Sequence, residues 1–367
     1  MGAAADTIHD KQGDPVKRRN LPQPASIAHR LNRRSLLAGS ALFGIPVLAG
    51  PRLARAAPQK FAFALNWFAV GDHCAYYVAL EKGYFEKAGL EVSLENSKGS
   101  ADSLSKVATG RMDAGLGEVA AVMAANARGA ELTVVGMIFD RSPLNVFSRK
   151  DMPAKSPKDL EGHTVGAPPG DGQRQVWPAF AKANNIDGSK VTWVNIEPTA
   201  KVPALATKRV DFVADYLTGL PLYEKAMGAG EVLMMPWSRF GMNMYSMSIA
   251  ASPATIRNRA DALRGFLAAA YQGWHDVMAD PAGSVAIFKR QVPEIDTDFI
   301  TKNMALGIDL MRTSRFAEHG LGWIDPARMR ETTDIVNTYM GLPKNVDPAT
   351  LFTDDFLTKI EMPISPT

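Results

Sequence analysis

From residue 61 onward, short apolar runs alternate with helix-like segments, and this alternation narrows the folds open to the chain. Residues 61–65 (FAFAL) form an apolar run that indicates a buried strand. Residues 75–82 have the pattern of a helix, and Gly83 is placed to cap its C-terminus. The alternation continues with a strand at 90–94, a helix at 102–109, a strand at 113–116, a helix at 119–128 and a strand at 132–138. This order predicts an α/β fold with a mainly parallel sheet covered on both faces.

Two segments of the chain repeat one another. Residues 109–116 and 207–214 share the pattern T-x-R-apolar-D followed by small or apolar residues, at an offset of 98. Each follows a helix-like stretch, so each predicts a helix, a tight turn and a buried strand that leads to one edge of a sheet. A match of this length can also arise by chance. Together with the strand–helix rhythm on both sides, it favours two similar lobes.

Composition suggests where these lobes begin and end. Residues 155–162 (KSPKDLEG) combine Pro with charged residues and open the second lobe, whose first strand is expected at 164–167. An apolar strand at 244–250 can carry the chain back, and the chain beyond residue 252 is largely helical. We expect a first lobe of residues 57–147 and 247–367 and a second lobe of residues 148–246. The C-terminal helices are expected to pack on the first lobe without a role in the site.

The first 56 residues differ from the rest of the chain in charge. They hold nine of the 41 Lys and Arg but three of the 38 Asp and Glu, which leaves 32 basic and 35 acidic residues beyond them. A near-neutral body gives no support for nucleic-acid binding, which normally needs a concentrated basic face. Arg33 and Arg34 precede an uncharged run at 36–50 that is shorter than the ~20 apolar residues of a membrane-spanning helix.

This leader has the organisation of an export signal. Ala54, Arg55 and Ala56 form a small-x-small cleavage site before Ala57, and the paired arginines indicate a twin-arginine signal over residues 1–56. An ordinary secretory signal and a basic tail remain the alternatives. No later stretch reaches ~18 uncharged apolar residues, so we expect a soluble periplasmic protein. Cys74 is the single cysteine, which excludes an internal disulfide and a cysteine-based metal site.

Several motifs near the start of the mature chain together resemble one protein class. They are Leu65-Asn66-Trp67, His73, Tyr77-Val78-Ala79, the run 81–85 (EKGYF), Gly89-Leu90 and the stretch 110–129. The pattern resembles the periplasmic binding proteins of the nitrate/taurine/sulfonate class, and within it the branch that handles thiamine-pyrimidine precursors. The resemblance runs from about residue 61 to residue 340. It implies a type II periplasmic binding protein fold, in which two α/β lobes close on a ligand by a hinge motion. It also implies docking on the permease subunits of an ABC importer, and we expect a monomer without cofactor or metal.

The same branch contains a fungal pyrimidine synthase, which offers an enzyme as the alternative. That enzyme consumes its own lysine-bound pyridoxal phosphate and a histidine, and holds iron near a cysteine-rich segment. The matching positions here are Gly117 and Ala121, and the cysteine-rich segment is missing. A Schiff base needs an amine. The sequence therefore argues against that activity, and no G-x-S-x-G or H-E-x-x-H motif supports a hydrolase.

Candidate ligand-binding residues of the first lobe follow its predicted strands. Trp67 comes directly after the first strand, at the edge where open α/β sheets bind ligands, and could stack on a planar molecule or simply cover the first helix. His73 precedes that helix and could donate a hydrogen bond into the cleft, although a lone histidine is often structural. Gly117 and Glu118 lie between a strand and a helix, where backbone N–H groups favour anions and Glu118 could accept from a ligand amine.

The second lobe offers a corresponding loop and strand end. The loop 169–175 (PGDGQRQ) supplies candidates for a cradle around an anion or amide, with Asp171 as the possible helix cap. These candidates are Gly170, Asp171, Gly172, Gln173 and Arg174. Asp215 and Tyr216 follow the repeated strand, so they should emerge at the same edge as Gly117 and Glu118.

These observations predict the substrate-binding component of an ABC importer, not an enzyme. The aromatic side chains suggest a planar ligand, and the two helix starts suggest an anionic group, as in a pyrimidine precursor, an aromatic acid or a sulfonate. A ligand sensor that docks on a membrane receptor would use the same lobes and is the further alternative.

Overall fold

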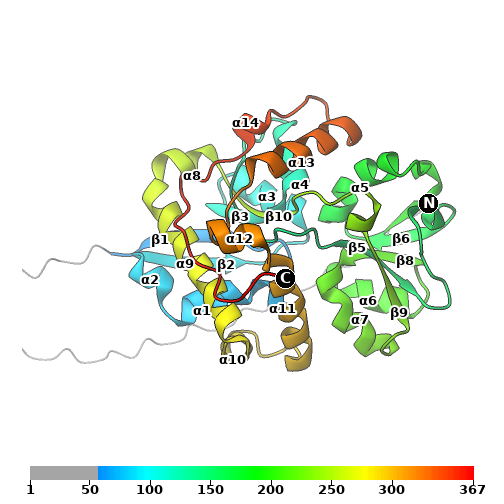
Figure 1. Cartoon of the computed structure of the whole chain (residues 1–367), viewed down its shortest axis with the longest axis horizontal. Coiled ribbons are helices and arrows are strands. Elements are labelled where there is room, and N and C mark those ends of the chain that lie inside the picture. The colour runs from blue at the N-terminus through cyan, green and yellow to red at the C-terminus, as the bar shows by residue number, and fades with distance from the viewer. Residues whose placement is uncertain (1–56) are drawn as a thin grey trace, which may run out of the picture. The chain divides into compact units, whose positions relative to one another are not determined.

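The computed structural model describes residues 57–367, and the export signal predicted for residues 1–56 lies outside the described residues. Within the described part, strands form two five-stranded sheets that lie in separate lobes (Figure 1). The first sheet has the order β2-β1-β3-β10-β4 and the second has the order β7-β6-β8-β5-β9. The first comprises β1 (Gln59–Ala64), β2 (Leu90–Glu95), β3 (Ala114–Glu118), β4 (Thr133–Met137) and β10 (Met247–Ala251). The second comprises β5 (Leu144–Arg149), β6 (Thr164–Ala167), β7 (Thr192–Asn195), β8 (Phe212–Tyr216) and β9 (Val232–Pro236).

The two sheets share one topology. In the first, β1 pairs in parallel with β2 and β3, and β10 is antiparallel to β3 and β4. In the second, β6 pairs in parallel with β7 and β8, and β5 is antiparallel to β8 and β9. The antiparallel strands β5 and β10 are the ones that follow the two crossovers of the chain. The predicted α/β fold is confirmed, with these two strands as the departure from a parallel sheet.

The repeated T-x-R-apolar-D segment has the same structural task in both lobes. Asp113 accepts a hydrogen bond from the backbone N–H of Ala62 at 2.7 Å, and Asp211 accepts one from Thr164 at 2.9 Å. Each carboxylate thereby ties the start of β3 or β8 to the neighbouring strand. The turn residue before each strand, Gly110 or Lys208, has a positive φ, of 74° and 61° respectively. The echo in the sequence therefore reflects a repeated local structure.

Helices cover both faces of the sheets, and the bounds of the helices predicted at 75–82, 102–109 and 119–128 agree with the structure to within about two residues. The first-lobe helices are α1 (Cys74–Glu81), α2 (Tyr84–Lys87), α3 (Ser100–Ala108) and α4 (Val119–Asn126). The second-lobe helices are α5 (Gly172–Ala183), α6 (Lys201–Ala206) and α7 (Leu220–Met227). After β10 come α8 (Pro253–Asn258), α9 (Ala260–Ala279), α10 (Pro281–Gln291), α11 (Thr297–Met311), α12 (Ser314–His319), α13 (Pro326–Tyr339) and α14 (Pro348–Leu351). Short 3₁₀ helices include η1 (Gly71–His73) and η5 (Leu217–Gly219), which both reach the site.

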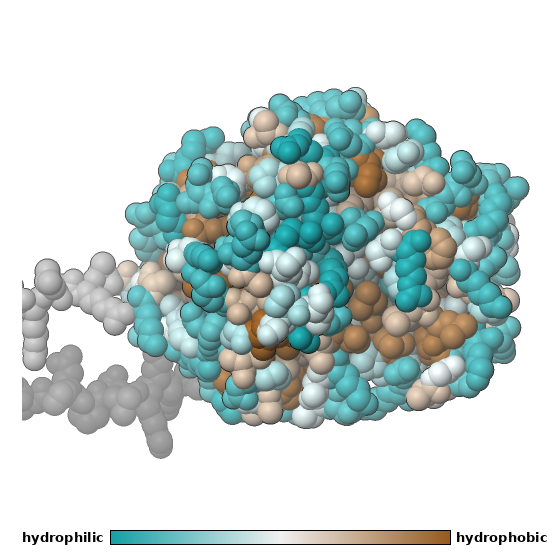
Figure 2. Space-filling view, viewed as in Figure 1, coloured by the Kyte–Doolittle hydropathy of each residue, from teal (hydrophilic) through white to brown (hydrophobic). Residues whose placement is uncertain are grey.

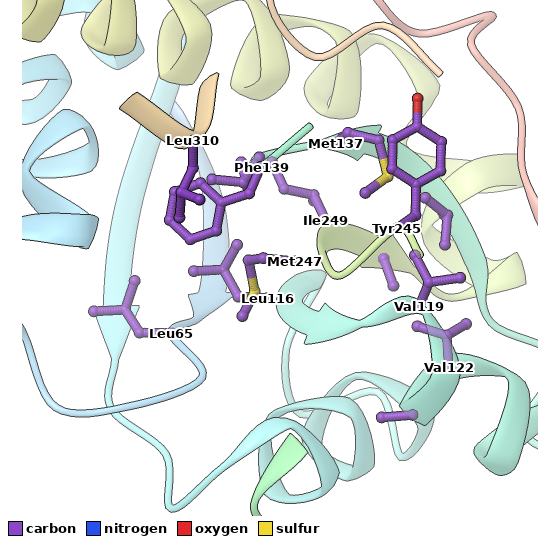
Figure 3. Close-up of a cluster of buried hydrophobic side chains, with 14 of the residues drawn as sticks. Leu65, Leu116, Val119, Val122, Met137, Phe139, Tyr245, Met247, Ile249 and Leu310 are labelled. Carbon is purple, nitrogen blue, oxygen red and sulfur yellow. The ribbon is translucent and has the colours of Figure 1, made fainter. Parts of the chain in front are cut away.

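The core of the first lobe lies between its sheet and the C-terminal helices. Figure 3 shows Leu116, Met247 and Ile249 from adjacent strands gathered with Phe139 and with Leu310 of α11. On the other side, Phe266 of α9 stacks on Phe61 with a centroid distance of 4.6 Å. Burial of these apolar side chains stabilises the lobe at about 25 cal/mol per Å² removed from water. The C-terminal helices are thus part of the first-lobe core.

The molecular surface is mainly hydrophilic on the face shown in Figure 2, with hydrophobic side chains gathered over part of the second lobe. Among the described residues, Met234 of β9 is the exposed large hydrophobic side chain, at 39% exposure. No helix within residues 57–367 is long and apolar enough to cross a membrane.

Candidate ligand-binding cleft

A cleft lies between the two lobes, where the carboxyl ends of β1, β3, β6 and β8 meet. It encloses about 780 Å³ including its open mouth, but its interior leaves only about 80 Å³ for water-sized molecules. A ring-sized ligand therefore needs the lobes to separate or the lining side chains to move. The first-lobe lining consists of Asn66, Trp67, Phe68, Val70, Asp72, His73, Gly99, Ser100, Leu116, Ile138, Phe139, Met247, Phe299 and Asn303. The second-lobe lining consists of Asp171, Gly172, Gln173, Lys201, Asp215, Tyr216, Thr218, Gly219, Leu222 and Tyr223.

The loop after β1 supplies the aromatic wall and fixes His73. Trp67 and Phe68 both line the cleft, with ring centroids 5.8 Å apart. The backbone N–H of Val70 donates to Nδ1 of His73 at 3.3 Å, so Nε2 carries the proton and donates to Oδ1 of Asn66 at 3.0 Å. Burial lowers the pKa of His73 to about 3, so the ring is neutral. His73 lines the cleft, but both its ring nitrogens form hydrogen bonds within the loop that carries Trp67.

Glu118 ends β3 and lies directly behind the lined surface. It is 1% exposed and accepts hydrogen bonds from the hydroxyls of Tyr216 and Ser246. Burial raises the pKa of Glu118 to about 7, although both hydroxyl donors oppose that shift. Tyr216 ends β8, so this hydrogen bond joins the carboxyl ends of equivalent strands. The sequence-based expectation that the two strand ends share one edge agrees with this geometry.

Gly117 does not line the cleft but lies in the packing between β3 and α3. A Cβ atom at this position would lie 2.8 Å from the side chain of Leu104 on α3. Glycine therefore allows α3 to approach β3 closely. The backbone carbonyl of Gly117 accepts a hydrogen bond from Ser248 of β10 at 2.8 Å.

The loop after β6 brings the second lobe into backbone contact with the first. The carbonyl of Gly170 accepts a hydrogen bond from the N–H of Ala101 at 3.2 Å. A Cβ on Gly172 would lie 2.4 Å from Cγ of Glu118, and a Cβ on Gly99 would lie 2.3 Å from the carbonyl oxygen of Gly170. Glycines on both sides thus permit the lobes to touch. Gly170 does not line the cleft itself. With Lys98 and Glu197 it lines a neighbouring pocket that adjoins the cleft at Phe68, and we call this pocket the mouth.

Asp171 caps α5, as the sequence indicated. Its Oδ1 accepts from the N–H groups of Gln173 at 2.9 Å and Arg174 at 3.4 Å. These N–H groups consequently have partners within the chain and are not free for an anionic ligand. Gln173 lines the cleft, and its side-chain amide donates to the carbonyl of Asn145 at 2.8 Å.

Arg174 points away from the cleft, against the expectation that it forms part of the cradle. Its Nη1 donates to the carbonyl of Ala167 at 3.3 Å and to Oδ1 of Asn195 at 2.5 Å. Its guanidinium lies 5.3 Å from the ring of Trp193. The first turn of α5 rotates this side chain onto the outer surface, which spacing along the loop did not indicate.

Lys201 is a cleft residue that sequence reasoning missed. It begins α6 and is 2% exposed, with Nζ 2.8 Å from Oδ2 of Asp171 and 3.2 Å from Oδ1 of Asp215. The same ammonium lies 4.4 Å from the centre of the Trp67 ring. Burial alone would lower the pKa of Lys201, but the two aspartates outweigh burial and raise it. No motif marks this lysine, because a charged residue at a helix start usually faces solvent.

The C-terminal helix α11 also reaches the cleft, which corrects the expectation that these helices have no role in the site. Phe299 and Asn303 line it. The Asn303 side chain accepts from the N–H of Asp72 at 3.0 Å and donates to the carbonyl of Thr218 at 2.8 Å. Thr218, on η5 of the second lobe, donates to Oδ2 of Asp72 at 2.7 Å. One asparagine therefore links both lobes at the floor of the cleft.

The site contains no cluster of metal-ligand type within residues 57–367: no group of three or more His, Cys, Asp or Glu is arranged to hold a metal ion. The described lining combines aromatic faces, buried carboxylates and the ammonium of Lys201.

Comparison with known proteins supports this description. A family model described as "NMT1/THI5 like" matches residues 70–284, which is more than half of the chain. The riboflavin-binding protein RibY of Chloroflexus aurantiacus is 24% identical over 306 residues, covering 82% of this chain and 86% of that protein. The 4-amino-5-hydroxymethyl-2-methylpyrimidine phosphate synthase of Schizosaccharomyces pombe is 28% identical over 108 residues, which span 29% of this chain and 31% of the enzyme.

Solved structures share the fold at low sequence identity. The periplasmic aliphatic sulphonate binding protein SsuA from Escherichia coli has a TM-score of 0.61 and 16% identity, covering 83% of this chain and 94% of SsuA. The periplasmic nitrate-binding protein NrtA from Synechocystis PCC 6803 has a TM-score of 0.59 and 12% identity, covering 82% of this chain and 87% of NrtA. The chain therefore has the periplasmic binding protein fold.

Proposed function

The chain belongs to the NMT1/THI5-like family, and from that premise we propose that it captures a small planar molecule outside the cytoplasm and delivers it to an ABC importer. The observation that carries this proposal is the cleft at the carboxyl ends of two matched sheets, where ligands of open α/β folds bind. The ligand would enter between the lobes and supply the differential affinity that favours their closed arrangement.

Contacts across the cleft support a closing motion. Tyr216 bonds to Glu118, Thr218 bonds to Asp72, and the mouth carries an exposed ion pair between Lys98 and Glu197 at 3.0 Å. These polar contacts can break and reform more readily than packed apolar ones. Helix α5 of the second lobe also packs on α4 and α13 of the first lobe, away from these polar contacts. The lobes would separate to admit a ligand and then regain these bonds around it.

Trp67 is the residue that we propose as the stacking platform, with Tyr216 on the opposite wall. RibY, whose name records riboflavin binding, makes riboflavin one reasonable candidate, and pyrimidine precursors are another. Both are planar ring compounds. The roles proposed for His73, Asp171 and Asp215 are to position this platform and to complete the polar wall.

We propose a binding protein and not an enzyme, although the chain resembles part of the fungal synthase. The resemblance places Gly117 and Ala121 where that enzyme has its lysine and histidine. A lysine could not replace Gly117 without displacing Leu104 on α3, because a Cβ there would already lie 2.8 Å from it. At this position the chain lacks the amine that the Schiff base of that enzyme needs, which supports a binding role.

The proposal includes the lobe limits of residues 57–147 with 247–367 and residues 148–246, and export of a monomer by the twin-arginine route. Replacing Arg33 and Arg34 by lysine tests the route: the precursor should remain in the cytoplasm. Continued export of that variant would indicate the ordinary secretory route. A sensor that docks on a receptor would use the same lobes. Uptake of the ligand into cells distinguishes the two roles, because only the importer component would support it.

The ligand hypothesis is tested by titration calorimetry against riboflavin, thiamine-pyrimidine precursors, aromatic acids, taurine, alkanesulfonates and nitrate. Trp67→Ala should weaken binding of the best ligand by about tenfold or more, since aromatic stacking and lost apolar contact together exceed 1.4 kcal/mol. Trp323→Ala is the matched control, because Trp323 stacks on His319 outside the cleft lining. Absence of binding across the whole panel would contradict the proposed function.

A further inference from the structure

The cleft holds more acidic than basic side chains. Its lining contains three aspartates, Asp72, Asp171 and Asp215, and Glu118 lies directly behind it. Lys201 is the single Lys or Arg among the lining residues that the structure describes. This balance differs from what an anionic ligand would require.

Almost all the carboxylate oxygens here already have partners within the chain. Lys201 forms ion pairs with one oxygen of Asp171 and one oxygen of Asp215. The other oxygen of Asp171 accepts from N–H groups of α5, and the other oxygen of Asp215 accepts from the Tyr223 hydroxyl. Both oxygens of Glu118 accept from hydroxyls. These groups are therefore largely satisfied by the protein itself.

Asp72 is the exception. Its Oδ2 accepts from Thr218, but its Oδ1 is buried without a hydrogen-bond partner, and within residues 57–367 Asp72 forms no ion pair. A buried acceptor without a partner is costly, and a donor that reaches it gains a charge-assisted hydrogen bond. Helix α11 packs closely beside this oxygen, since a Cβ on Gly307 would lie only 3.0 Å from it.

We infer that Asp72 determines the charge of the ligand: the cleft accepts neutral or cationic planar molecules that carry N–H or O–H donors, and it rejects sulfonates, nitrate and carboxylates. This inference rests on the proposed function and assigns a chemical class to the same site. A ligand donor would bond to Asp72 while its ring lies near the aromatic wall. An anion would instead be repelled by several carboxylates. The single ammonium that could attract it, that of Lys201, is already paired with two aspartates.

The environment of Asp72 agrees with this assignment. Burial raises the pKa of Asp72 to about 7, and nearby Asp215 raises it further against the lowering effect of Thr218 and Asn303. The adjacent His73 is neutral, and the charge of Asp72 contributes to the raised pKa of the Tyr216 hydroxyl. A donor or cation at Oδ1 would stabilise the ionised carboxylate, whereas an anion would oppose it.

A matched pair of planar probes tests the inference. Benzamidine and benzenesulfonate have the same ring but opposite charges, and each is titrated into the full-length mature protein at pH 8 by calorimetry and by intrinsic tryptophan fluorescence. The wild-type protein should bind benzamidine at least tenfold more tightly. Asp72→Asn, which keeps an acceptor for Thr218, should reduce that ratio by about tenfold. Asp261→Asn, at a side chain 99% exposed on α9, should leave it unchanged.

The possible failures are distinguishable. The inference is overturned if the wild-type protein binds benzenesulfonate as tightly as benzamidine or more tightly, or does not bind benzamidine at 10 mM. These measurements use the wild-type protein, so they remain decisive even if Asp72→Asn does not fold. If the wider panel nevertheless contains a ligand, the proposed function stands and only the charge assignment fails. If neither the probes nor the panel bind, both fail.

Discussion

The two walls of the cleft stand on equivalent sheets but have different chemistry. The first-lobe wall is mainly aromatic and apolar, with Trp67 presented by a loop whose polar groups bond to one another and Asp72 as its acidic lining residue. The second-lobe wall is ionic, with Lys201 held between Asp171 and Asp215. Equivalent positions even meet: Glu118 and Tyr216, 98 residues apart, form a hydrogen bond across the cleft. A repeated scaffold thus brings corresponding strand ends together, and the residues at those ends decide what each wall recognises.

The ionic character of the second wall is tested by Lys201→Met. This change leaves two buried aspartates without their cation, which should lower the free energy of unfolding by about 3–5 kcal/mol. Urea unfolding at pH 7 measures the effect. The control is Lys208→Met, which removes an ion pair to Asp151 that is more than half exposed on both sides and should cost at most about 1 kcal/mol. Equal losses in the two variants would show that the buried cluster has no special role.

Glu118 tests how the first lobe depends on its partner across the cleft. Its pKa of about 7 in the folded protein exceeds its ordinary value of 4.5, so the folded state holds the proton more tightly. The stabilisation from this group is therefore full below pH 4.5 and is lost as the pH rises through 7. Glu118→Gln cannot titrate, so its stability relative to wild type should increase by on the order of 3 kcal/mol between pH 4 and pH 8.

Urea unfolding at several pH values measures that difference. His73 has a lowered pKa and an opposite pH dependence, but it is present in both proteins and cancels in the comparison. Glu318→Gln, at a side chain 75% exposed, is the control and should give a flat difference. A flat difference for Glu118→Gln as well would contradict the geometry described for this carboxyl group.

The sequence could predict the scaffold and named Asp171 and Asp215 as candidates, but it did not indicate the lysine that lies between them. The alternation of elements and the repeat around Asp113 and Asp211 are local patterns, so they predict strands, helices and mainly parallel sheets. The strand order and the antiparallel β5 and β10 depend on tertiary pairing instead. Lys201 and Asn303 reach the cleft through tertiary packing of α6 and α11, which local periodicity does not describe. Arg174 shows the opposite error, a residue that the sequence assigned to the cleft but whose side chain lies elsewhere. The first turn of α5 directs it away from the cleft.

The smallest expected effect concerns the backbone contact between the walls. Gly99 has a φ of 121°, and a Cβ there would lie 2.3 Å from the carbonyl oxygen of Gly170. Gly99→Ala should therefore hinder closure and weaken binding of the best panel ligand by about tenfold, or 1.4 kcal/mol. Gly228→Ala carries a comparable backbone penalty, with φ of 105° and ψ of 145°, but the nearest atom to the added Cβ is Cγ of Glu231 at 3.5 Å, an ordinary contact. Calorimetry should show unchanged affinity for this control, and an equal loss in both variants would exclude the interlobe contact as the cause.

Closure of the two lobes on a shared ligand is tested most directly by cross-linking across the mouth. Lys98 and Glu197 face one another there, and the single native cysteine, Cys74, is buried. In the double variant Lys98→Cys/Glu197→Cys, a short bifunctional maleimide should join the two positions at least about fivefold faster when the best panel ligand is bound. A rate that stays the same, or falls, at saturating ligand would contradict closure around this cleft.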